Sequence, residues 1–304
     1  MYKDGIMGVI IGDALGCPVQ FKAREEVKKN PVKGMRGHGT FNMPEGTWTD
    51  DGSMTLATLD SIAERNGVDL DDIMQRFVRW NNKGDYTPFG FAFDQGITCT
   101  SAIQNYEQNG DVRTCGGTSE RSNGNGALMR ILPVCLYALR FGDTKAIEMV
   151  HRVAGLTHNH IRGLIGCGLY YFMVKAVIND SGSLKERLEK GLNRGFNFYY
   201  SSGEIGHYNR MSNLDILAEI EEDGIRSSGY VVDSLEAAVW GLITTESFEK
   251  ALLKVVNLGD DSDTVGAICG GLAGLYYGYD NIPEDWLKVI KRREWIEGLC
   301  RKMD

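Results

Sequence analysis

Residues 70–80 read LDDIMQRFVRW, and their apolar side chains recur at spacings of three and four. This spacing places them along one stripe of an α-helix, whereas a half-buried strand would need strict alternation. The stretch SFEKALLKVV at 247–256 repeats the pattern. Because alternating patterns are scarce elsewhere, the sequence predicts a helical protein. The two stripes consist of Leu70, Ile73, Met74, Phe77 and Val78, and of Phe248, Ala251, Leu252, Val255 and Val256.

Helical patterns continue on both sides of these two stretches. Asn66-Gly67, Asn109-Gly110 and Ser181-Gly182 follow apolar runs as helix stop signals. No proline-rich or serine-rich linker and no repeat of fixed period divides the chain. We therefore expect one compact all-α domain over residues 1–304, built of about a dozen helices. The further helices are expected near 5–15, 52–65, 94–107, 126–141, 144–155, 161–178, 184–196, 212–221, 232–243, 264–277 and 284–302.

The charge balance is acidic: 33 Lys and Arg residues stand against 41 Asp and Glu residues, which gives a formal net charge of −8. A negative field attracts neither nucleic acid nor anionic membrane, so a protein that coats nucleic acid is excluded. With 42% hydrophobic and 24% charged residues the chain can bury a large core, which excludes wholesale disorder. A phosphate-bearing ligand is compatible with this charge where a metal ion intervenes.

Three features bear on the cellular setting. The seven cysteines include no CxxC pair and mostly occupy apolar surroundings, which favours buried thiols in a reducing compartment over disulfides. The N-terminal stretch MYKDGIMGVIIGDALG is a poor signal peptide because acids interrupt it. The apolar stretch 161–178 carries Arg162, Lys175 and three glycines, so we expect a buried helix and no membrane span. The expectation is a cytoplasmic protein, with a monomer favoured over an oligomer.

The chain contains 38 glycines, and some of them recur every four positions inside predicted helices. A glycine inside a helix costs up to about 1 kcal/mol relative to alanine, so such rows need a compensating gain. A face without Cβ atoms offers one, because another helix or a ligand can approach the backbone closely. Helix packing is the commoner explanation, but each row lies beside acidic residues. The rows are Gly8, Gly12 and Gly16, and Gly266, Gly270 and Gly274.

Two acidic stretches each precede a predicted helix: Thr49-Asp50-Asp51, and Asp260 to Thr264 in NLGDDSDTVG. Taken singly, each has a simple explanation, since Asp and Thr at a helix N-terminus cap free N–H groups. Taken together, they supply the carboxylate and hydroxyl oxygens that hard divalent cations prefer. If both stretches converge, their carboxylates repel one another unless cations neutralise them. Two metal ions would offset that charge and activate a water molecule.

A glycine-rich stretch, Ser122-Asn123-Gly124-Asn125-Gly126, precedes another predicted helix. It lacks the Gly-Lys-Ser/Thr ending of a Walker phosphate loop. A glycine-rich loop that enters a helix can still present backbone N–H groups to phosphate. A plain turn is the alternative explanation, and the residues alone leave the two open.

In their order along the chain, these motifs resemble the ADP-ribosylglycohydrolase family, which includes the dinitrogenase reductase-activating glycohydrolases and the ADP-ribosyl-acceptor hydrolases. Any one stretch is weak, but six in the same order are specific. The resemblance implies an all-α domain with a di-magnesium or di-manganese centre, in agreement with the helical prediction. The matching stretches are GVIIGDALGCPVQF at 8–21, TWTDDGSM at 47–54, FDQGITCTSAI at 93–103, SNGNGALMRILP at 122–133, LTHNH at 156–160 and NLGDDSDTVGAICGGLAGLYYG at 257–278.

The resemblance also implies roles for individual residues. The metal ligands would be Thr49, Asp50, Asp51, Asp261, Asp263 and Thr264. The ADP-ribose would contact Asp13, His158 and the loop of Ser122, Asn123, Gly124 and Asn125, which receives the diphosphate and ribose. Asp94 matches an acid near the scissile bond, and the catalytic candidates are Asp50, Asp51, Asp94 and Asp261.

Two positions depart from the family pattern. Members often carry glutamate where Gln20 stands, and an amide cannot act as a general base. A mechanism that requires a carboxylate at this position is therefore disfavoured here. The glycine pair common before the second acidic stretch is Gly259-Asp260 in this chain, which adds a carboxylate without an assigned role.

The resemblance implies a hydrolase that uses two divalent metal ions, Mg²⁺ or Mn²⁺, to release ADP-ribose from a modified protein side chain. Cleavage would pass through an oxocarbenium-like state, with the ions orienting ribose and water and an aspartate accepting the proton of the water. Arginine is the first choice of acceptor, and O-linked ADP-ribose, on serine or in an ester, is the alternative. A non-catalytic ADP-ribose-binding protein and a metal-dependent phosphohydrolase are the rival classes. The expected partner is an ADP-ribosylated protein or ADP-ribose itself.

Overall fold

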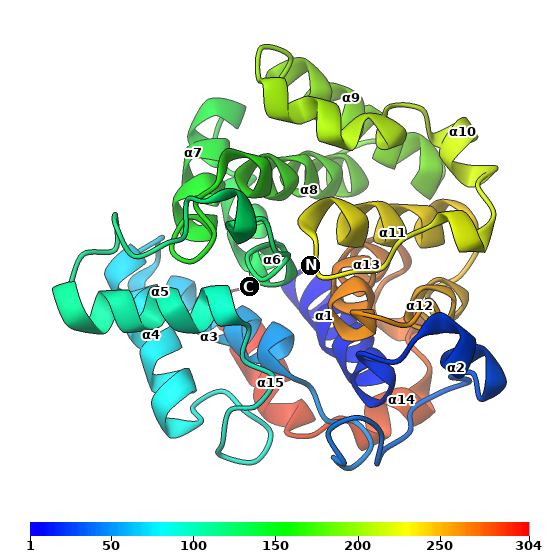
Figure 1. Cartoon of the computed structure of the whole chain (residues 1–304), viewed down its shortest axis with the longest axis horizontal. Coiled ribbons are helices and arrows are strands. Elements are labelled where there is room, and N and C mark those ends of the chain that lie inside the picture. The colour runs from blue at the N-terminus through cyan, green and yellow to red at the C-terminus, as the bar shows by residue number, and fades with distance from the viewer. Residues whose placement is uncertain (304) are drawn as a thin grey trace.

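Two glycine-faced helices, α1 (Tyr2–Gly16) and α13 (Ser262–Tyr277), pack antiparallel at the centre of the computed structural model, which describes residues 1–303 (Figure 1). A Cβ atom on Gly8 or Gly12 would collide with backbone atoms of Gly270 or Gly266, and the reverse also holds. The two glycine rows therefore face each other, and helix packing accounts for their spacing. Both helices are buried almost all round, so neither has a polar face.

The remaining helices surround this central pair (Figure 1). Residues 1–303 contain fifteen α-helices, six 3₁₀ helices and no β-strand, with only two isolated β-bridges, Gly117–His158 and Gly124–Tyr230. The all-α prediction is confirmed. The other α-helices are α2 Arg24–Lys29, α3 Asp50–Arg65, α4 Leu70–Lys83, α5 Ile97–Asn109, α6 Leu132–Ala138, α7 Asp143–Ala154, α8 Ile161–Asn179, α9 Leu184–Phe198, α10 Leu214–Ala218, α11 Val231–Ile243, α12 Phe248–Val256, α14 Glu284–Val289 and α15 Arg293–Arg301. The 3₁₀ helices are η1 Cys17–Val19, η2 Glu120–Ser122, η3 Leu128–Arg130, η4 Gly203–Ser212, η5 Glu222–Gly224 and η6 Tyr279–Asn281.

Three predicted helices differ from the observed ones, and backbone geometry explains each difference. The stretch expected as one helix at 126–141 divides into η3 and α6, because Pro133 lacks the N–H that a continuous helix needs. The stretch 284–302 divides into α14 and α15 at Arg292, whose φ of 55° is left-handed. Helix α5 begins at Ile97 instead of 94, since Asp94 has a φ of 60°. The short helices α2 and η4 were not predicted, and the fifteen α-helices exceed about a dozen because of α2 and the division into α14 and α15.

Helix α8 occupies the predicted apolar stretch. Among the described residues it is the one helix long and apolar enough, by length and composition alone, to cross a membrane. In the fold, 78% of its apolar window is buried, mainly against α7 and α9. That burial is what a core helix shows, and the expectation of a buried helix is confirmed.

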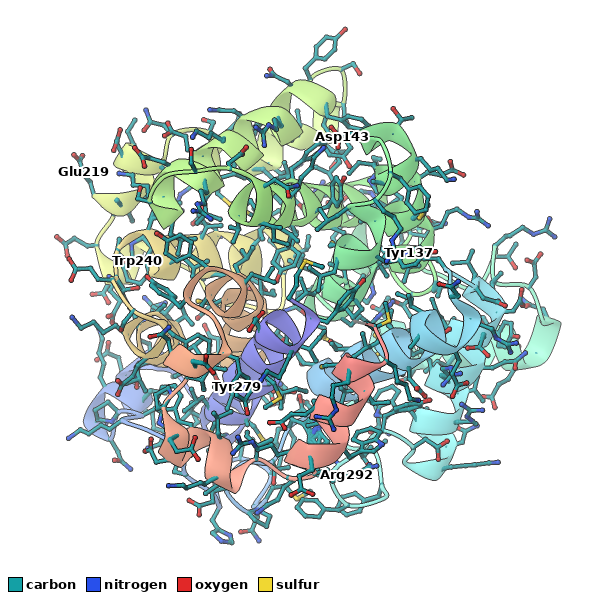
Figure 2. All side chains as sticks on the ribbon, turned by 180° about the vertical axis from the view of Figure 1, so that it is seen from behind. Tyr137, Asp143, Glu219, Trp240, Tyr279 and Arg292 are labelled. Carbon is teal, nitrogen blue, oxygen red and sulfur yellow. The ribbon has the colours of Figure 1, made fainter. Side chains whose placement is uncertain are left out.

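The C-terminal helices close the rear of α1 (Figure 2). The ammonium of Lys3 lies 3.7 Å from the ring centroid of Tyr279, and the backbone N–H of Tyr279 donates to Asp4 at 3.1 Å. Arg293 donates to the hydroxyl of Tyr279 at 2.7 Å. These contacts hold the N-terminal turn of α1, so the opposite end of α1 is presented to α3 and α13.

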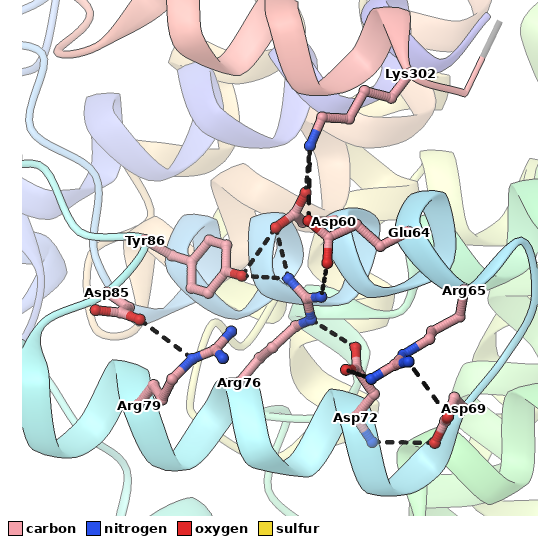
Figure 3. Close-up of polar contacts among 10 residues, drawn as sticks. All are labelled: Asp60, Glu64, Arg65, Asp69, Asp72, Arg76, Arg79, Asp85, Tyr86 and Lys302. Atoms are coloured by element: carbon pink, nitrogen blue, oxygen red, sulfur yellow. Dashed lines mark hydrogen bonds and ion pairs between the residues drawn. The ribbon is translucent and has the colours of Figure 1, made fainter.

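Helix α3 is fixed to α4 and α15 by a buried ionic network centred on Arg76 (Figure 3). The guanidinium donates to Asp60 on α3 and to Asp72 on α4, each at 2.6 Å. Glu64 accepts a further hydrogen bond from Arg76, and Tyr86 and Lys302 both donate to Asp60 at 2.9 Å. Every buried charge in the network therefore has an opposite partner.

Candidate active site

The two acidic stretches meet where the N-termini of α3 and α13 abut the C-terminal end of α1. The hydroxyls of Thr49 and Thr264 each lie 3.3 Å from the same carboxylate oxygen of Asp51. The hydroxyl of Ser262 donates to the carbonyl of Gly16 at 2.9 Å, which ties the start of α13 to α1. Residues about two hundred positions apart thus form one cluster, because the glycine rows let α1 and α13 pack closely.

Helix capping does not explain the two acidic stretches. Neither Thr49, the N-cap of α3, nor Asp261, the N-cap of α13, makes a side-chain capping hydrogen bond. The start of α3 is held instead by Asp13 of α1, whose carboxylate accepts the N–H groups of Thr49 at 3.0 Å and Gly52 at 2.8 Å. The acids of the cluster are therefore free for another purpose.

Asp13 lies behind the cluster and not in a cavity wall. Its side chain is fully buried, and its carboxylate is engaged by α3. This geometry gives Asp13 a positioning role, while its contact with substrate stays a prediction.

The cluster is a set of buried and half-buried acids without basic partners. Within residues 1–303, no hydrogen bond or ion pair joins a Lys or Arg side chain to its members, which are Asp50, Asp51, Asp94, Asp261 and Asp263. Burial, reinforced by the neighbouring carboxylates, raises the pKa of Asp50, Asp51 and Asp263 well above the usual carboxyl value. Burial also raises the pKa of Asp94 to about 7. Negative charge is concentrated here without protein compensation.

The donor set suits hard divalent cations. One carboxylate oxygen each of Asp51, Asp94 and Asp263 is buried without a hydrogen-bond partner, and an orphaned oxygen of this kind is costly unless something binds it. Among the described residues, no three His, Cys, Asp or Glu side chains are already grouped as ligands of a single ion. The fit therefore rests on oxygen chemistry, burial and uncompensated charge.

A cavity of about 250 Å³ opens beside the acids. Its wall includes seven of the residues predicted for the site: Asp50, Asp94, Gly124, Asn125, His158, Asp261 and Thr264. The predicted residues Thr49, Asp51 and Asp263 lie behind that wall, within the cluster. A second cavity, about 990 Å³, lies near α4, α5 and α7 and contains none of the predicted site residues.

The loop at 122–126 enters the cavity through its second half only. A Cβ on Gly124 or Gly126 would lie 3.2 or 2.9 Å from the ring of His158, so these glycines allow close approach of the imidazole. The side chain of Asn125 donates to Asp261 at 2.7 Å and thereby orients one acid of the cluster. The hydroxyl of Ser122 forms a hydrogen bond with the hydroxyl of Ser119 and does not line the cavity.

The side chain of Asn123 has one buried polar atom without a hydrogen-bond partner. Its amide nitrogen donates to the carbonyl of Glu120 at 3.0 Å, whereas its amide oxygen is buried without a partner. Its backbone carbonyl accepts the N–H of Val231 at 3.0 Å. The loop is thus anchored to the start of α11, a contact that no sequence motif indicated.

His158 is a neutral imidazole at the cavity wall. Its Nδ1 lies 2.8 Å from the hydroxyl of Thr157. Burial, together with the charge of Arg130, lowers the pKa of His158 to about 3. At neutral pH the ring can therefore act as a hydrogen-bonding and packing surface but not as a cation.

Of the two residues that depart from the family pattern, Gln20 contacts the acid cluster and Asp260 does not. The buried amide of Gln20 lies 3.5 Å from Asp261, and it also hydrogen-bonds Asp94. Asp260 is exposed with a φ of 51°, and its backbone pairs with Phe21 and Lys22. The extra carboxylate of Asp260 therefore lies outside the cluster.

Sequence reasoning missed several wall residues, including Phe21, Ile97 and Gly229. The carbonyl of Gly229 accepts the N–H of Asn125 at 3.0 Å, so the segment before α11 shapes the loop. The only sequence signal for Gly229 was the pair Ser228-Gly229 ahead of the helix predicted at 232–243. Such pairs occur at many turns, so this one did not indicate a site.

Comparison with known proteins decides the family. The family model for ADP-ribosylglycohydrolase matches residues 2–304. The chain belongs to the ADP-ribosylglycohydrolase family. Membership confirms the predicted resemblance over the whole chain and identifies the protein as a hydrolase of the ADP-ribosylglycohydrolase type.

Individual relatives of this ADP-ribosylglycohydrolase agree with that membership. The ADP-ribosylarginine hydrolase Tri1 of Serratia proteamaculans is 32% identical, over 99% of this chain and 78% of its own length. The ADP-ribosyl-dinitrogen reductase glycohydrolase of Rhodospirillum rubrum is 32% identical, over 93% of this chain and 88% of its own length. A solved structure described as an ADP-ribosylglycohydrolase-related protein complex is similar with a TM-score of 0.82 at 29% identity, covering 99% of this chain and 96% of that chain.

Proposed function

We propose that this ADP-ribosylglycohydrolase removes ADP-ribose from arginine side chains of proteins and requires divalent cations. The observation that carries the proposal is the buried acid cluster, whose orphaned oxygens and missing basic partners call for bound cations beside a cavity. Thr49, Asp50, Asp51, Asp261, Asp263 and Thr264 would hold two ions, Mg²⁺ or Mn²⁺. When bound, such ions polarise a water molecule and orient ribose hydroxyls.

The residues of the chain divide the remaining work between them. Asn125 and Gln20 hold Asp261 in place by hydrogen bonds at 2.7 and 3.5 Å. Asp94 lies in the wall with one buried carboxylate oxygen that has no hydrogen-bond partner, so its carboxylate is placed to take a proton and return it. We assign to Asp94 the proton of the attacking water during cleavage at the anomeric carbon. The neutral ring of His158 and the backbone at Gly124 form the side of the cavity available to the nucleotide.

Two observations favour arginine as the acceptor. The relative from Serratia proteamaculans is named as an ADP-ribosylarginine hydrolase and matches nearly the entire chain. Asp50 and Asp94 in the cavity wall could neutralise a leaving guanidinium group. O-linked ADP-ribose on serine or in an ester is the alternative acceptor, and it would not use that negative charge.

The test is hydrolysis of two modified proteins, one ADP-ribosylated on arginine and one on serine, with Mg²⁺, with Mn²⁺ and after EDTA treatment. We expect intact ADP-ribose from the arginine substrate, and loss of the rate when the ions are removed. Full activity after complete metal removal would overturn the cation requirement, and preference for the serine substrate would overturn the acceptor. Tight binding of ADP-ribose without turnover would indicate a non-catalytic binding protein. Release of phosphate or AMP would indicate a phosphohydrolase.

The setting that we propose for this activity is the cytoplasm. All seven cysteines are free and buried, which fits a reducing compartment. Fractionation of cells that produce the protein tests this location. A monomeric state stays a prediction that sedimentation analysis can check.

A further inference from the structure

Apolar side chains lie exposed at the mouth of the cavity. Large hydrophobic residues are usually buried, so a contiguous exposed group calls for an explanation. We name Phe21, Phe41, Phe89, Phe91, Phe93 and Ile97 the aromatic rim. Its exposed members are Phe21 (65%), Phe89 (42%), Phe91 (49%) and Ile97 (86%).

The five phenylalanine rings of the rim form a continuous series across two loops. The ring centroids of Phe21 and Phe41 are 6.2 Å apart, and those of Phe41 and Phe93 are 5.3 Å apart, which joins the segment before α3 to the α4–α5 loop. Phe91 lies 6.3 Å from both Phe89 and Phe93. Figure 1 shows these two loops on the same side of the molecule. Aromatic pairs at such distances support one another, so the rim is a preassembled surface.

The rim is joined to the candidate active site. Phe21 and Ile97 belong both to the rim and to the wall of the cavity. Between Tyr86 and Ile103, the only charged residue is Asp94. One carboxylate oxygen of Asp94 is buried, so this charge belongs to the cluster inside the cavity, and the stretch carries no other charge beside the rim.

We propose that the aromatic rim binds the polypeptide that flanks the ADP-ribosylated side chain, through apolar residues of that protein. The proposal rests on the proposed function. If the scissile bond lies beside the acid cluster and the nucleotide occupies the side of Gly124 and His158, the protein part of the substrate must leave through the mouth. The surface it meets there is the rim, whose four outer side chains remain exposed in the part of the chain that the structure describes, residues 1–303. An aromatic surface of this kind binds apolar side chains at little entropic cost.

The test compares two substrates in one double variant, F89S/F91S, whose residues line no part of the cavity. The substrates are a protein ADP-ribosylated on arginine and free ADP-ribosyl-arginine. We expect kcat/KM for the modified protein to fall about tenfold, mainly through KM, and kcat/KM for the free compound to stay within about twofold. Ile216→Ser removes an exposed apolar side chain (60%) from α10 and is expected to leave kcat/KM for both substrates unchanged. Thermal melting confirms that each variant is folded.

Each other outcome overturns the proposal. Equal losses on both substrates would assign the rim to the nucleotide, and unchanged kinetics on both would leave the rim without a role in substrate binding. A wild-type dimer that F89S/F91S converts to monomer would show that a second copy of this chain covers the rim. If the wild-type protein cleaves neither substrate, the proposed function itself fails and the rim proposal falls with it. A wild-type protein that cleaves both substrates, with rim variants that behave normally, refutes the rim proposal alone.

Discussion

Helix α3 carries acids at both ends, and the two groups differ in their partners. At the N-terminus, Asp50 and Asp51 belong to a buried cluster without a basic side chain. Toward the C-terminus, Asp60 and its neighbours surround Arg76 (Figure 3). Although burial alone would raise its pKa, hydrogen bonds from Arg76 and Arg65 hold the pKa of Asp72 at about 2.

The presence or absence of a basic partner distinguishes the acids that stabilise the fold from those of the candidate active site. Burial without a cation raises the pKa of Asp94 to about 7, whereas burial with a guanidinium lowers that of Asp72. The Arg76 network is internally satisfied, so it contributes to folding. The cluster is not satisfied within the chain, and ionisable groups left in this state are typical of active sites.

The largest expected effect comes from removing one acid of the cluster. Asp263→Asn preserves shape but removes a charge and an orphaned oxygen that a cation would bind. We expect kcat for ADP-ribose release to fall about 10³-fold. In EDTA the variant should be at least as stable as the wild-type protein, because it relieves repulsion among buried acids. Single-turnover assays and thermal melting measure the two quantities.

Asp260→Asn is the matched control for this variant. Asp260 is only three positions away and acidic but exposed, and asparagine tolerates its left-handed backbone. Its activity should stay within about twofold of the wild-type value. Comparable losses in both variants would contradict the assignment of the cluster.

The satisfied network should respond in the opposite way to loss of a residue. Arg76→Met leaves Asp60 and Asp72 buried without their shared partner, and we expect the free energy of unfolding to fall by about 3 kcal/mol. Arg79→Met is the control, since Arg79 is exposed and pairs only with Asp85 at 3.2 Å, and it should cost less than about 1 kcal/mol. Urea unfolding of both variants supplies the values. Similar losses in the two would show that burial of the network is unimportant.

The same contrast shows what sequence could predict. Helices α4 and α12 were predicted because their apolar residues repeat at helical spacing. Helices α1 and α13 are apolar all round, and only their glycine rows signalled the packing. The break at Arg292 was missed, since no proline or glycine marks it.

The site was predictable only in part, for a physical reason. The acids and the loop were found from helix-start patterns and from the order of motifs. Their convergence, the capping of α3 by Asp13 and the contact of Asn125 with Asp261 depend on tertiary packing. The aromatic rim lies in irregular loops, where no periodicity relates a residue to its neighbours in space.

Cations should stabilise the folded protein through the acid cluster and not through the Arg76 network. Asp13 and Asp94 have pKa values near 7 in the folded protein, whereas unfolded aspartate loses its proton near pH 4. Between about pH 4 and 7 the folded state holds more protons, so without cations its stability falls as pH rises. Mg²⁺ or Mn²⁺ at 100 times its dissociation constant should add about 2.7 kcal/mol. Because ions bind deprotonated ligands, this gain should be larger at pH 8 than at pH 5.

Thermal melting with EDTA, Mg²⁺ or Mn²⁺ at the two pH values measures this gain. Asp263→Asn should lose most of it, while Arg76→Met should retain it from a lower starting stability. An equal gain at both pH values, or in all three proteins, would indicate that the ions bind elsewhere.

The smallest expected effect concerns Asp72 in acid. Its folded pKa of about 2 lies below the unfolded value of about 4, so the unfolded state binds more protons between these values. The stability that Asp72 contributes, about 2 kcal/mol, is therefore complete above pH 4 and disappears as pH falls toward 2. Asp72→Asn should be less stable than the wild-type protein at pH 7, and the gap should narrow by pH 3. Asp85→Asn, an exposed acid beside Arg79, should show no such gap in urea titrations. A gap that stays constant with pH would mean that Asp72 acts through packing and not through its charge.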